Sequence, residues 1–267
     1  MAKRRQNSKP TKGKFAPGNH ELGLTELFAL VRNVNPTWMA TETEPNTWNG
    51  GLTMADALDA AEFGRWDAPA IESITLPEIA GESIDTQYRY DVTGMALDVA
   101  TFLSGEPEYW RDEITVPKPC GRVIRLSIEI GGMNEVSAAS MANRGQAIIA
   151  LINSLELQGH SVELTIVRAY VNTSSERYSF LIPVKHAGQA LDMKRIQFMI
   201  GHPSFYRRVL FGLAEVAHNA SLGTVSTGTR EYCPEGFTAH IPSYAGLSST
   251  LDGSLNWAKQ FALTLAN

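Results

Sequence analysis

The sequence predicts an α+β protein: a small mixed or antiparallel sheet with helices on one face, preceded by a basic, disordered N-terminal arm. Three observations support this class. The first fourteen residues are polar and basic, the next hundred favour helices and loops, and strand-like alternation and helical periodicity take turns from residue 122 onwards. We therefore divide the chain into an arm (1–20), a mainly helical region (21–118) and an α+β core region (119–267).

The arm has six basic side chains among its first fourteen residues and no acidic one: Lys3, Arg4, Arg5, Lys9, Lys12 and Lys14. Since the whole chain carries a formal −5, the remaining residues carry −11 once this +6 is removed. The arm has too few apolar groups to offset the entropy of ordering. A cationic segment on an acidic body indicates a polyanionic ligand, while the body itself resists broad adhesion to duplex DNA.

The mainly helical region has helical spacing in its apolar residues and loops that are rich in proline and glycine. Thr53 with Asp56 forms an approximate capping box at the start of one helix, and Gly64 is a suitable terminator. The elements expected here are helices at 21–33, 53–64 and 95–103, a loop at 35–51 and a strand at 85–92.

The α+β core region has the sharpest pattern. Ile124, Leu126 and Ile128 alternate as in a strand, and Pro203 suits the first turn of a helix. We expect strands at 122–130, 161–171 and 177–185, helices at 137–157, 192–201, 203–218 and 251–266, and a turn-rich segment at 223–243 with room for one or two short strands. The order β-α-β-β-α is compatible with a split β-α-β arrangement.

Common catalytic and cofactor signatures are absent from the sequence. It has no GxxxxGK[ST], no GxGxxG after a strand and no GxSxG, and its six histidines and two cysteines lack metal-ligand spacing. We therefore expect no cofactor and no metal. The longest apolar run, 147–152, is far below the roughly 20 residues that span a bilayer. No apolar stretch follows the basic N-terminus, so we expect a cytoplasmic protein, and a homo-oligomer is left open.

Aromatic and basic residues of two strands and one helix suggest a site for single-stranded DNA. Tyr178 and Phe180 share one face of their strand, and aromatic side chains on a sheet with arginines nearby can stack unpaired bases. The proposed set on the body is Arg168, Tyr170, Arg177, Tyr178, Phe180, Arg207 and Arg208. The alternatives are that the aromatics fill the core under the helices and that the two adjacent arginines pair with body carboxylates.

Acidic residues offer an enzymatic alternative. Five carboxylates lie close together in the sequence and would hold Mg²⁺ if the fold gathered two or three of them: Asp85, Asp91, Asp98, Glu106 and Glu108. On this hypothesis the protein is a metal-dependent nuclease or hydrolase that uses Asp91, Asp98 and Glu106. The competing interpretation places these residues in a turn, on a helix surface and in a solvated loop. A third hypothesis is a virion or interaction protein without either activity.

Several short patches together resemble a known family. They are Trp48-Asn49-Gly50-Gly51, the alanine-rich helix that follows, Asp91-Val92-Thr93-Gly94, Asp98-Val99, 103–108, Arg144-Gly145, Gly159, Val162-Glu163-Leu164, His202-Pro203, Arg207-Arg208 and Phe211. Over roughly residues 48–211 the chain resembles a family of phage- and plasmid-borne proteins of largely unassigned function. It is also similar to the single-stranded-DNA-binding RNA-polymerase cofactor of podoviruses. That resemblance implies a non-enzymatic phage protein that binds single-stranded DNA without sequence preference in transcription or replication, with a phage RNA polymerase as partner.

Overall fold

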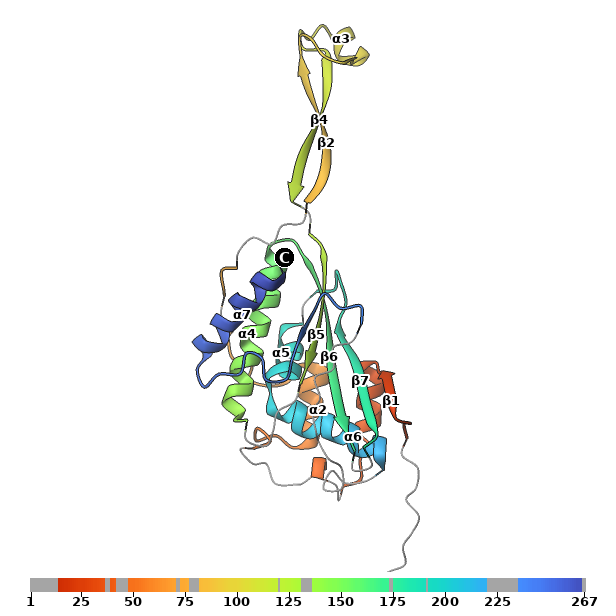
Figure 1. The fold of residues 1–267 in the computed structure, drawn as a ribbon, viewed down its shortest axis with the longest axis vertical. Helices are drawn as coiled ribbons and strands as arrows, with labels where there is room; N and C mark the ends of the chain where they lie inside the picture. Colours follow the sequence, from red (N-terminus) through yellow and green to blue (C-terminus); the bar gives the residue numbers. More distant parts are fainter. Residues whose placement is uncertain are drawn as a thin grey trace, which may run out of the picture.

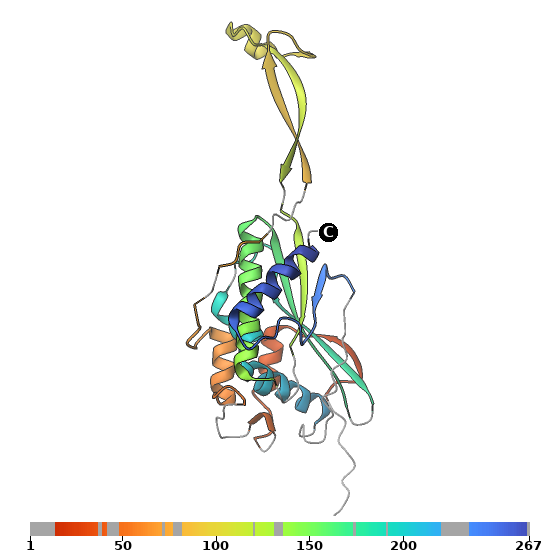
Figure 2. The ribbon, with the colours of Figure 1, turned by 60° about the vertical axis from the view of Figure 1, so that its left-hand side comes forward.

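The computed structural model describes residues 14–36, 39–41, 48–70, 73–76, 82–119, 121–130, 136–172, 175–190, 192–219 and 235–265. These residues form a body built on one sheet and a long hairpin that projects from it (Figures 1 and 2). The class predicted from the sequence, an α+β protein with a small mixed sheet, is confirmed.

The body contains a five-stranded mixed sheet in the order β1-β7-β6-β5-β8. Its strands are β1 (Gly18–Glu21), β5 (Val123–Glu129), β6 (Ser161–Val171), β7 (Arg177–Lys185) and β8 (Ala239–Ile241). β5 runs parallel to both β6 and β8, whereas β7 runs antiparallel to β6 and parallel to β1. The carboxyl ends of β5, β6 and β8 therefore lie at one edge of the sheet, where parallel sheets commonly bind ligands.

Helices cover one face of this sheet, because its apolar side chains have to be removed from water on that side. In β5, Ile124 and Leu126 are fully buried, while Val123 and Arg125, which alternate with them, are exposed. The covering elements are α1 (Leu24–Val31), η1 (Met39–Thr41), α2 (Met54–Phe63), α4 (Ala138–Leu157), α5 (Met193–Gly201), the π-helical turn η2 (Phe205–Leu210), α6 (Phe211–His218) and α7 (Leu251–Leu265). Within the described residues, no helix is both long and apolar enough to cross a bilayer.

The crossing of α4 and α5 depends on two glycines. A Cβ atom on Gly145 of α4 would lie 2.2 Å from the Cα atom of Gly201 in α5. No real pair of atoms approaches so closely without a shift of backbone, so the helices contact each other through bare backbone at this point. The sequence predicted Gly201 only as the last residue of a helix, and the structure shows that it is also a packing residue against α4.

The projecting hairpin forms a separate three-stranded antiparallel sheet in the order β2-β4-β3. It consists of β2 (Glu82–Asp91), β3 (Ala96–Leu97), the short helix α3 (Val99–Ser104) and β4 (Trp110–Pro119). Both views show it extending away from the body along the longest axis of the molecule (Figures 1 and 2). The sequence predicted β2 but missed β4, so the description of 21–118 as mainly helical is wrong for its last third.

Two boundaries predicted from the sequence also change. The arm was expected to reach residue 20, but Gly18–Glu21 forms β1, which pairs with the edge of β7 from Tyr178 to Leu181. The division near 118 coincides with the base of the hairpin. It does not separate two cores, because α1 and α2 share one hydrophobic core with the helices and strands that follow residue 121.

Candidate functional site

Arg207 and Arg208 lie in η2 and clamp backbone segments from the N-terminal half of the chain. Arg207 donates from Nη1 to the carbonyl of Trp48 and from Nη2 to that of Val136 (2.7 Å), and its guanidinium lies 4.5 Å from the Trp48 ring. Arg208 donates to the carbonyls of Ala40 (3.1 Å) and Leu52 (3.2 Å). Both side chains are buried. The prediction that this pair faces phosphates in solvent is therefore wrong: its N–H groups hold loops in place.

In the same region, two patches that lie far apart in the sequence, 48–51 and 202–204, pack against each other. Gly50 adopts φ +79°, and a Cβ atom there would lie 2.8 Å from a ring carbon of His202. Ser204 donates to the carbonyl of Asn49, and the His202 ring stacks on Phe198 at 4.8 Å. Burial lowers the pKa of His202 to about 4. The Trp-Asn-Gly-Gly turn and the residues around Pro203 are thus in direct packing contact.

The aromatic face predicted to stack bases is also buried. Tyr170, Tyr178 and Phe180 are 2%, 5% and 0% exposed, and the rings of Tyr170 and Tyr178 stack on each other at 5.5 Å. The structure confirms the alternative in which they fill the core beneath the helices. We call Arg168, Tyr170, Tyr178, Phe180, Tyr206, Phe211 and His218 the arginine–aromatic cluster, since ring and cation–π contacts join them.

The expectation that Arg168 contacts nucleic acid at the surface is also corrected, because its side chain is only 1% exposed inside this cluster. Of the basic residues assigned to nucleic acid, Arg177 at the start of β7 and Lys14 are exposed. Lys3, Arg4, Arg5, Lys9 and Lys12 lie outside the described residues. Among described residues, the structure therefore leaves only two side chains of the predicted set on the surface.

The carboxylates of the metal hypothesis lie on the hairpin, and two of them, Asp91 and Asp98, form local hydrogen bonds. Asp98 is the N-cap of α3 and accepts hydrogen bonds from the amides of Ala100 (3.0 Å) and Thr101 (3.1 Å) and from the Tyr90 hydroxyl (3.0 Å). These bonds, that from the Thr101 amide foremost, hold the pKa of Asp98 below its ordinary value. Asp91 accepts from the Val92 amide (2.7 Å). In the part of the chain that the structure describes, no three metal-ligating side chains gather.

The outer part of the hairpin, residues 88–114, exposes apolar side chains to an unusual degree, and we call it the hairpin apex. None of its residues is buried. Eight of the thirteen large hydrophobic residues found exposed among the described ones belong to it: Tyr88, Tyr90, Val92, Met95, Leu97, Val99, Phe102 and Leu103. Met95 and Leu103 are 90% and 76% exposed. Six acidic residues against two arginines give the apex a formal charge of −4.

The sequence of β4 has a pattern that is typical of a strand. Trp110, Ile114 and Val116 fall on one side of an alternating pattern, and the β-branched run 114–116 favours a strand. The two strands then pair from Glu82 opposite Pro119 to Asp91 opposite Trp110. What the pattern does not contain is any sign that the apolar side chains stay uncovered.

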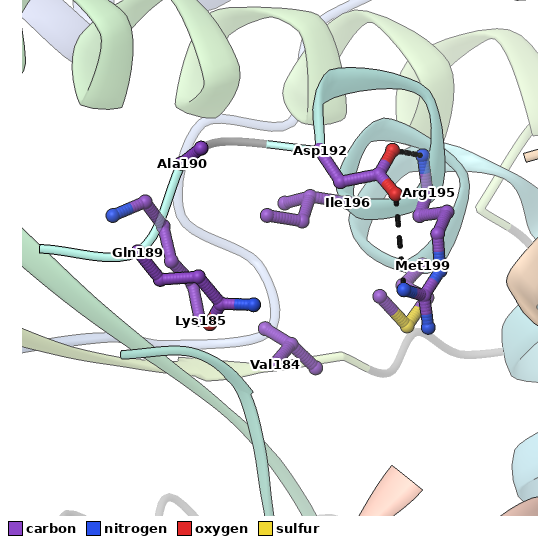
Figure 3. Close-up of a pocket in the computed structure, with 8 residues that line it drawn as sticks. All are labelled: Val184, Lys185, Gln189, Ala190, Asp192, Arg195, Ile196 and Met199. Carbon is purple, nitrogen blue, oxygen red and sulfur yellow. Dashed lines mark hydrogen bonds and ion pairs between the residues drawn. The ribbon is translucent and has the colours of Figure 1, made fainter. Parts of the chain in front are cut away.

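A small hollow lies between the end of β7 and the start of α5 (Figure 3). It measures about 20 Å³, room for a single water molecule. Lys185 lines it but is engaged, because its Nζ forms an ion pair with Glu156 at 2.6 Å and donates to the Val162 carbonyl at 3.0 Å. Asp192 accepts from the Arg195 amide and pairs with its guanidinium. The hollow is too small for an organic ligand.

The described residues thus define an α+β protein with a body built on one mixed sheet and a projecting hairpin whose apex is apolar and acidic. The chain belongs to the family DUF7192, a domain of unknown function, whose model matches residues 24–244. This span includes the whole hairpin, and the family's description agrees with the largely unassigned function expected from the sequence. Comparison with curated proteins and with solved structures finds no match.

Proposed function

We propose that this is a non-enzymatic interaction protein whose hairpin apex docks onto a basic, partly apolar surface of another protein. The carrying observation is the exposure of eight large hydrophobic side chains within residues 88–103, held away from the body by two paired strands. A concentration of exposed apolar side chains in one segment normally marks a contact site, since exposing apolar surface to water costs free energy. A two-stranded hairpin is only marginally stable by itself. The projecting hairpin is therefore expected to serve a purpose other than the stability of the fold.

The composition of the apex fits a protein partner. It combines aromatic residues, a methionine and Arg111, whose guanidinium lies 4.8 Å from the Tyr88 ring. Aromatic residues, Met and Arg are the types enriched at protein interfaces. The net charge of −4 repels phosphate backbones and attracts a basic surface. A basic protein is therefore the complementary occupant.

The N-terminal arm favours single-stranded DNA as a second ligand. Its six basic residues would release counterions from phosphates on binding. Gly18 pairs with Tyr178, so the arm joins the body beside the exposed Arg177. β1 and the hairpin apex lie toward opposite ends of the molecule (Figure 1). This arrangement supports a bridging role in the cytoplasm, in which the arm holds DNA and the apex holds a protein such as a phage RNA polymerase.

Photo-crosslinking tests the docking proposal. A photoreactive residue at Met95 or Leu103 should crosslink one protein in a native extract, and the same residue at Leu263, an exposed apolar position on α7, should not. Leu103→Asp in the Met95-labelled chain should abolish the product, because it places a charge in the apolar contact. Equal labelling from Leu263, or a product that survives Leu103→Asp, would contradict the proposal. A crosslinked homodimer would identify a second copy instead of a foreign partner.

Fluorescence anisotropy with single- and double-stranded oligonucleotides across a salt series tests the second ligand. We expect a preference for single strands at low salt and a salt slope that flattens when residues 1–14 are removed. Leu103→Asp is the matched control, since it alters the apex and leaves the arm intact. Binding that shows no single-strand preference at low salt sinks the DNA part of the proposal and leaves the docking part standing.

A further inference from the structure

Arg168 is a buried cation whose hydrogen bonds are largely unmade. It is 1% exposed, and within the described part of the chain its one hydrogen bond runs from Nη1 to the Tyr206 hydroxyl at 3.4 Å. Its Nε and Nη2 atoms have no acceptor among the described residues. An unmade hydrogen bond of a buried charged group is costly, so this arrangement needs an explanation.

The other buried arginines show how this protein normally satisfies such a group. Arg144 donates to the carbonyls of Ala245 (2.7 Å), Pro242 (2.9 Å) and Glu129 (3.1 Å). Arg207 and Arg208 likewise end on backbone carbonyls. Arg168 reaches no carbonyl and forms no ion pair with a described carboxylate. The difference singles it out from three arginines of similar burial.

Aromatic rings surround Arg168 without occupying its open edge. Its Cζ atom lies 5.0 Å from the ring centroid of Tyr206, 5.2 Å from that of Tyr170 and 5.9 Å from that of Phe211. These rings attract the cation through their π faces. They do not supply in-plane acceptors to Nε and Nη2, the two N–H groups that form the side-on fork of a guanidinium. That fork matches the two oxygens of a carboxylate or a phosphate.

Two further polar groups of the arginine–aromatic cluster are open as well. The Tyr170 hydroxyl and Nε2 of His218 are buried without a hydrogen-bond partner in the described part of the chain. Burial raises the pKa of Tyr170, so its hydroxyl keeps its proton and can donate. His218 is the last residue of α6 and its ring lies 5.4 Å from that of Tyr170. The Arg168 guanidinium can only donate and the Tyr170 hydroxyl can also donate, so the missing component is an acceptor.

We propose that the side-on fork of Arg168 binds an oxyanion, a carboxylate or a phosphate, between β6 and the segment that runs from η2 into the start of α6. Arg168 is the fourth residue from the end of β6, near the edge where the carboxyl ends of the parallel strands lie. The anion accepts from Nε and Nη2 of Arg168, with the Tyr170 hydroxyl as an additional donor. This site is independent of the hairpin apex and of the N-terminal arm.

Thermal unfolding of the full chain with inorganic phosphate, and in a parallel arm with acetate, tests the site. Potassium chloride at matched ionic strength is the reference. We expect a saturable rise in Tm with one of the two anions, phosphate pointing to a phosphoester ligand and acetate to a carboxylate. Arg168→Met should remove the rise and leave the Tm without anion equal or higher, because it removes an unpaired buried charge. Arg177→Met, at an exposed position of β7, should retain the rise.

Equilibrium dialysis of the wild-type chain with radiolabelled phosphate or acetate keeps the proposal falsifiable if Arg168→Met does not fold. The wild type should bind about one anion, and Arg168→Lys, which keeps the charge but loses the fork, should bind it about tenfold more weakly or worse. The proposal is overturned if neither anion raises the Tm beyond the chloride reference, which would leave water as the occupant. Retention of the rise in Arg168→Met, or unchanged affinity in Arg168→Lys, overturns it equally.

Discussion

The hairpin apex and the arginine–aromatic cluster place similar residue types in opposite environments. The apex leaves Tyr88, Tyr90 and Phe102 between 40% and 49% exposed, whereas the cluster buries Tyr170, Tyr178 and Phe180 to 5% exposure or less. Arg111 at the apex contacts a ring at the surface, and Arg168 contacts three rings in the interior. The same types of side chain are therefore exposed to solvent in one region and hold the core together in the other.

This contrast shows that residue type does not identify a binding surface in this protein. The aromatic and basic residues with the clearest nucleic-acid pattern are structural, and those on the hairpin, which has no such pattern, are accessible. It also implies a difference in energetics. Changes inside the body, with the exception of the unpaired Arg168, should lower the free energy of unfolding, while changes at the apex should alter binding alone.

Among the variants that should still fold, the largest loss of stability is expected from removing an arginine of η2. Arg207→Ala should lower the free energy of unfolding by about 3–5 kcal/mol, because it removes a buried side chain that donates to the carbonyls of Trp48 and Val136 and leaves a cavity in its place. Urea denaturation measures this. Arg177→Ala is the matched control and should stay within about 0.5 kcal/mol of wild type. A fully stable Arg207→Ala chain with weakened DNA binding would restore the surface role rejected above.

The helix crossing should be the next most sensitive point. Gly145→Ala should cost about 2–3 kcal/mol, since its Cβ atom meets backbone that cannot move aside as a flexible side chain would. Gly23→Ala, at a glycine with nothing within 4 Å of an added Cβ, should cost less than about 1 kcal/mol. Thermal or urea unfolding of the two variants measures both losses of stability. Equal losses would show that the two helices do not pack as closely as described.

Acid should destabilise the body through His202. The pKa of its ring is about 4 in the folded state, below the ordinary value of 6.5, so the unfolded chain binds a proton first as the pH falls. Stability from this group is complete above about pH 6.5 and is lost between there and pH 4, by about 2 kcal/mol after allowance for partial exposure. Urea titrations at several pH values measure the slope. His202→Asn should flatten it, and an unchanged slope would assign the acid sensitivity elsewhere.

The apex should contribute least. Leu103→Asp should change the free energy of unfolding by no more than about 0.5 kcal/mol, because Leu103 is already 76% exposed and loses no packing. Leu213→Asp, at a fully buried leucine of α6, is the opposite case and should prevent folding. Circular dichroism on heating compares them. A substantial loss for Leu103→Asp would mean that the apex packs on the protein itself.

Sequence patterns predicted much of the region from 122 to 218. β5, β6 and β7 appear within one or two residues of their expected bounds, and Ser137 caps α4 as the start at 137 requires. In these segments one face is covered by the body, so the spacing of apolar residues along the sequence matches the residues that are buried. The prediction failed where the covered face was missing. β4 and β1 lie at edges or outside the body, and their side chains carry no comparable constraint.

The sequence alone determined the fold class, the charge separation between arm and body, and the absence of common catalytic motifs, because each follows from composition and local periodicity. Only the tertiary structure decided which side of each strand meets water. The strand that contains Tyr178 and Phe180 has an apolar face, and whether that face is covered by helices or left open to a ligand depends on α6, tens of residues away. Burial is a property of non-local packing, so the surface on which function depends emerged only when the elements were assembled.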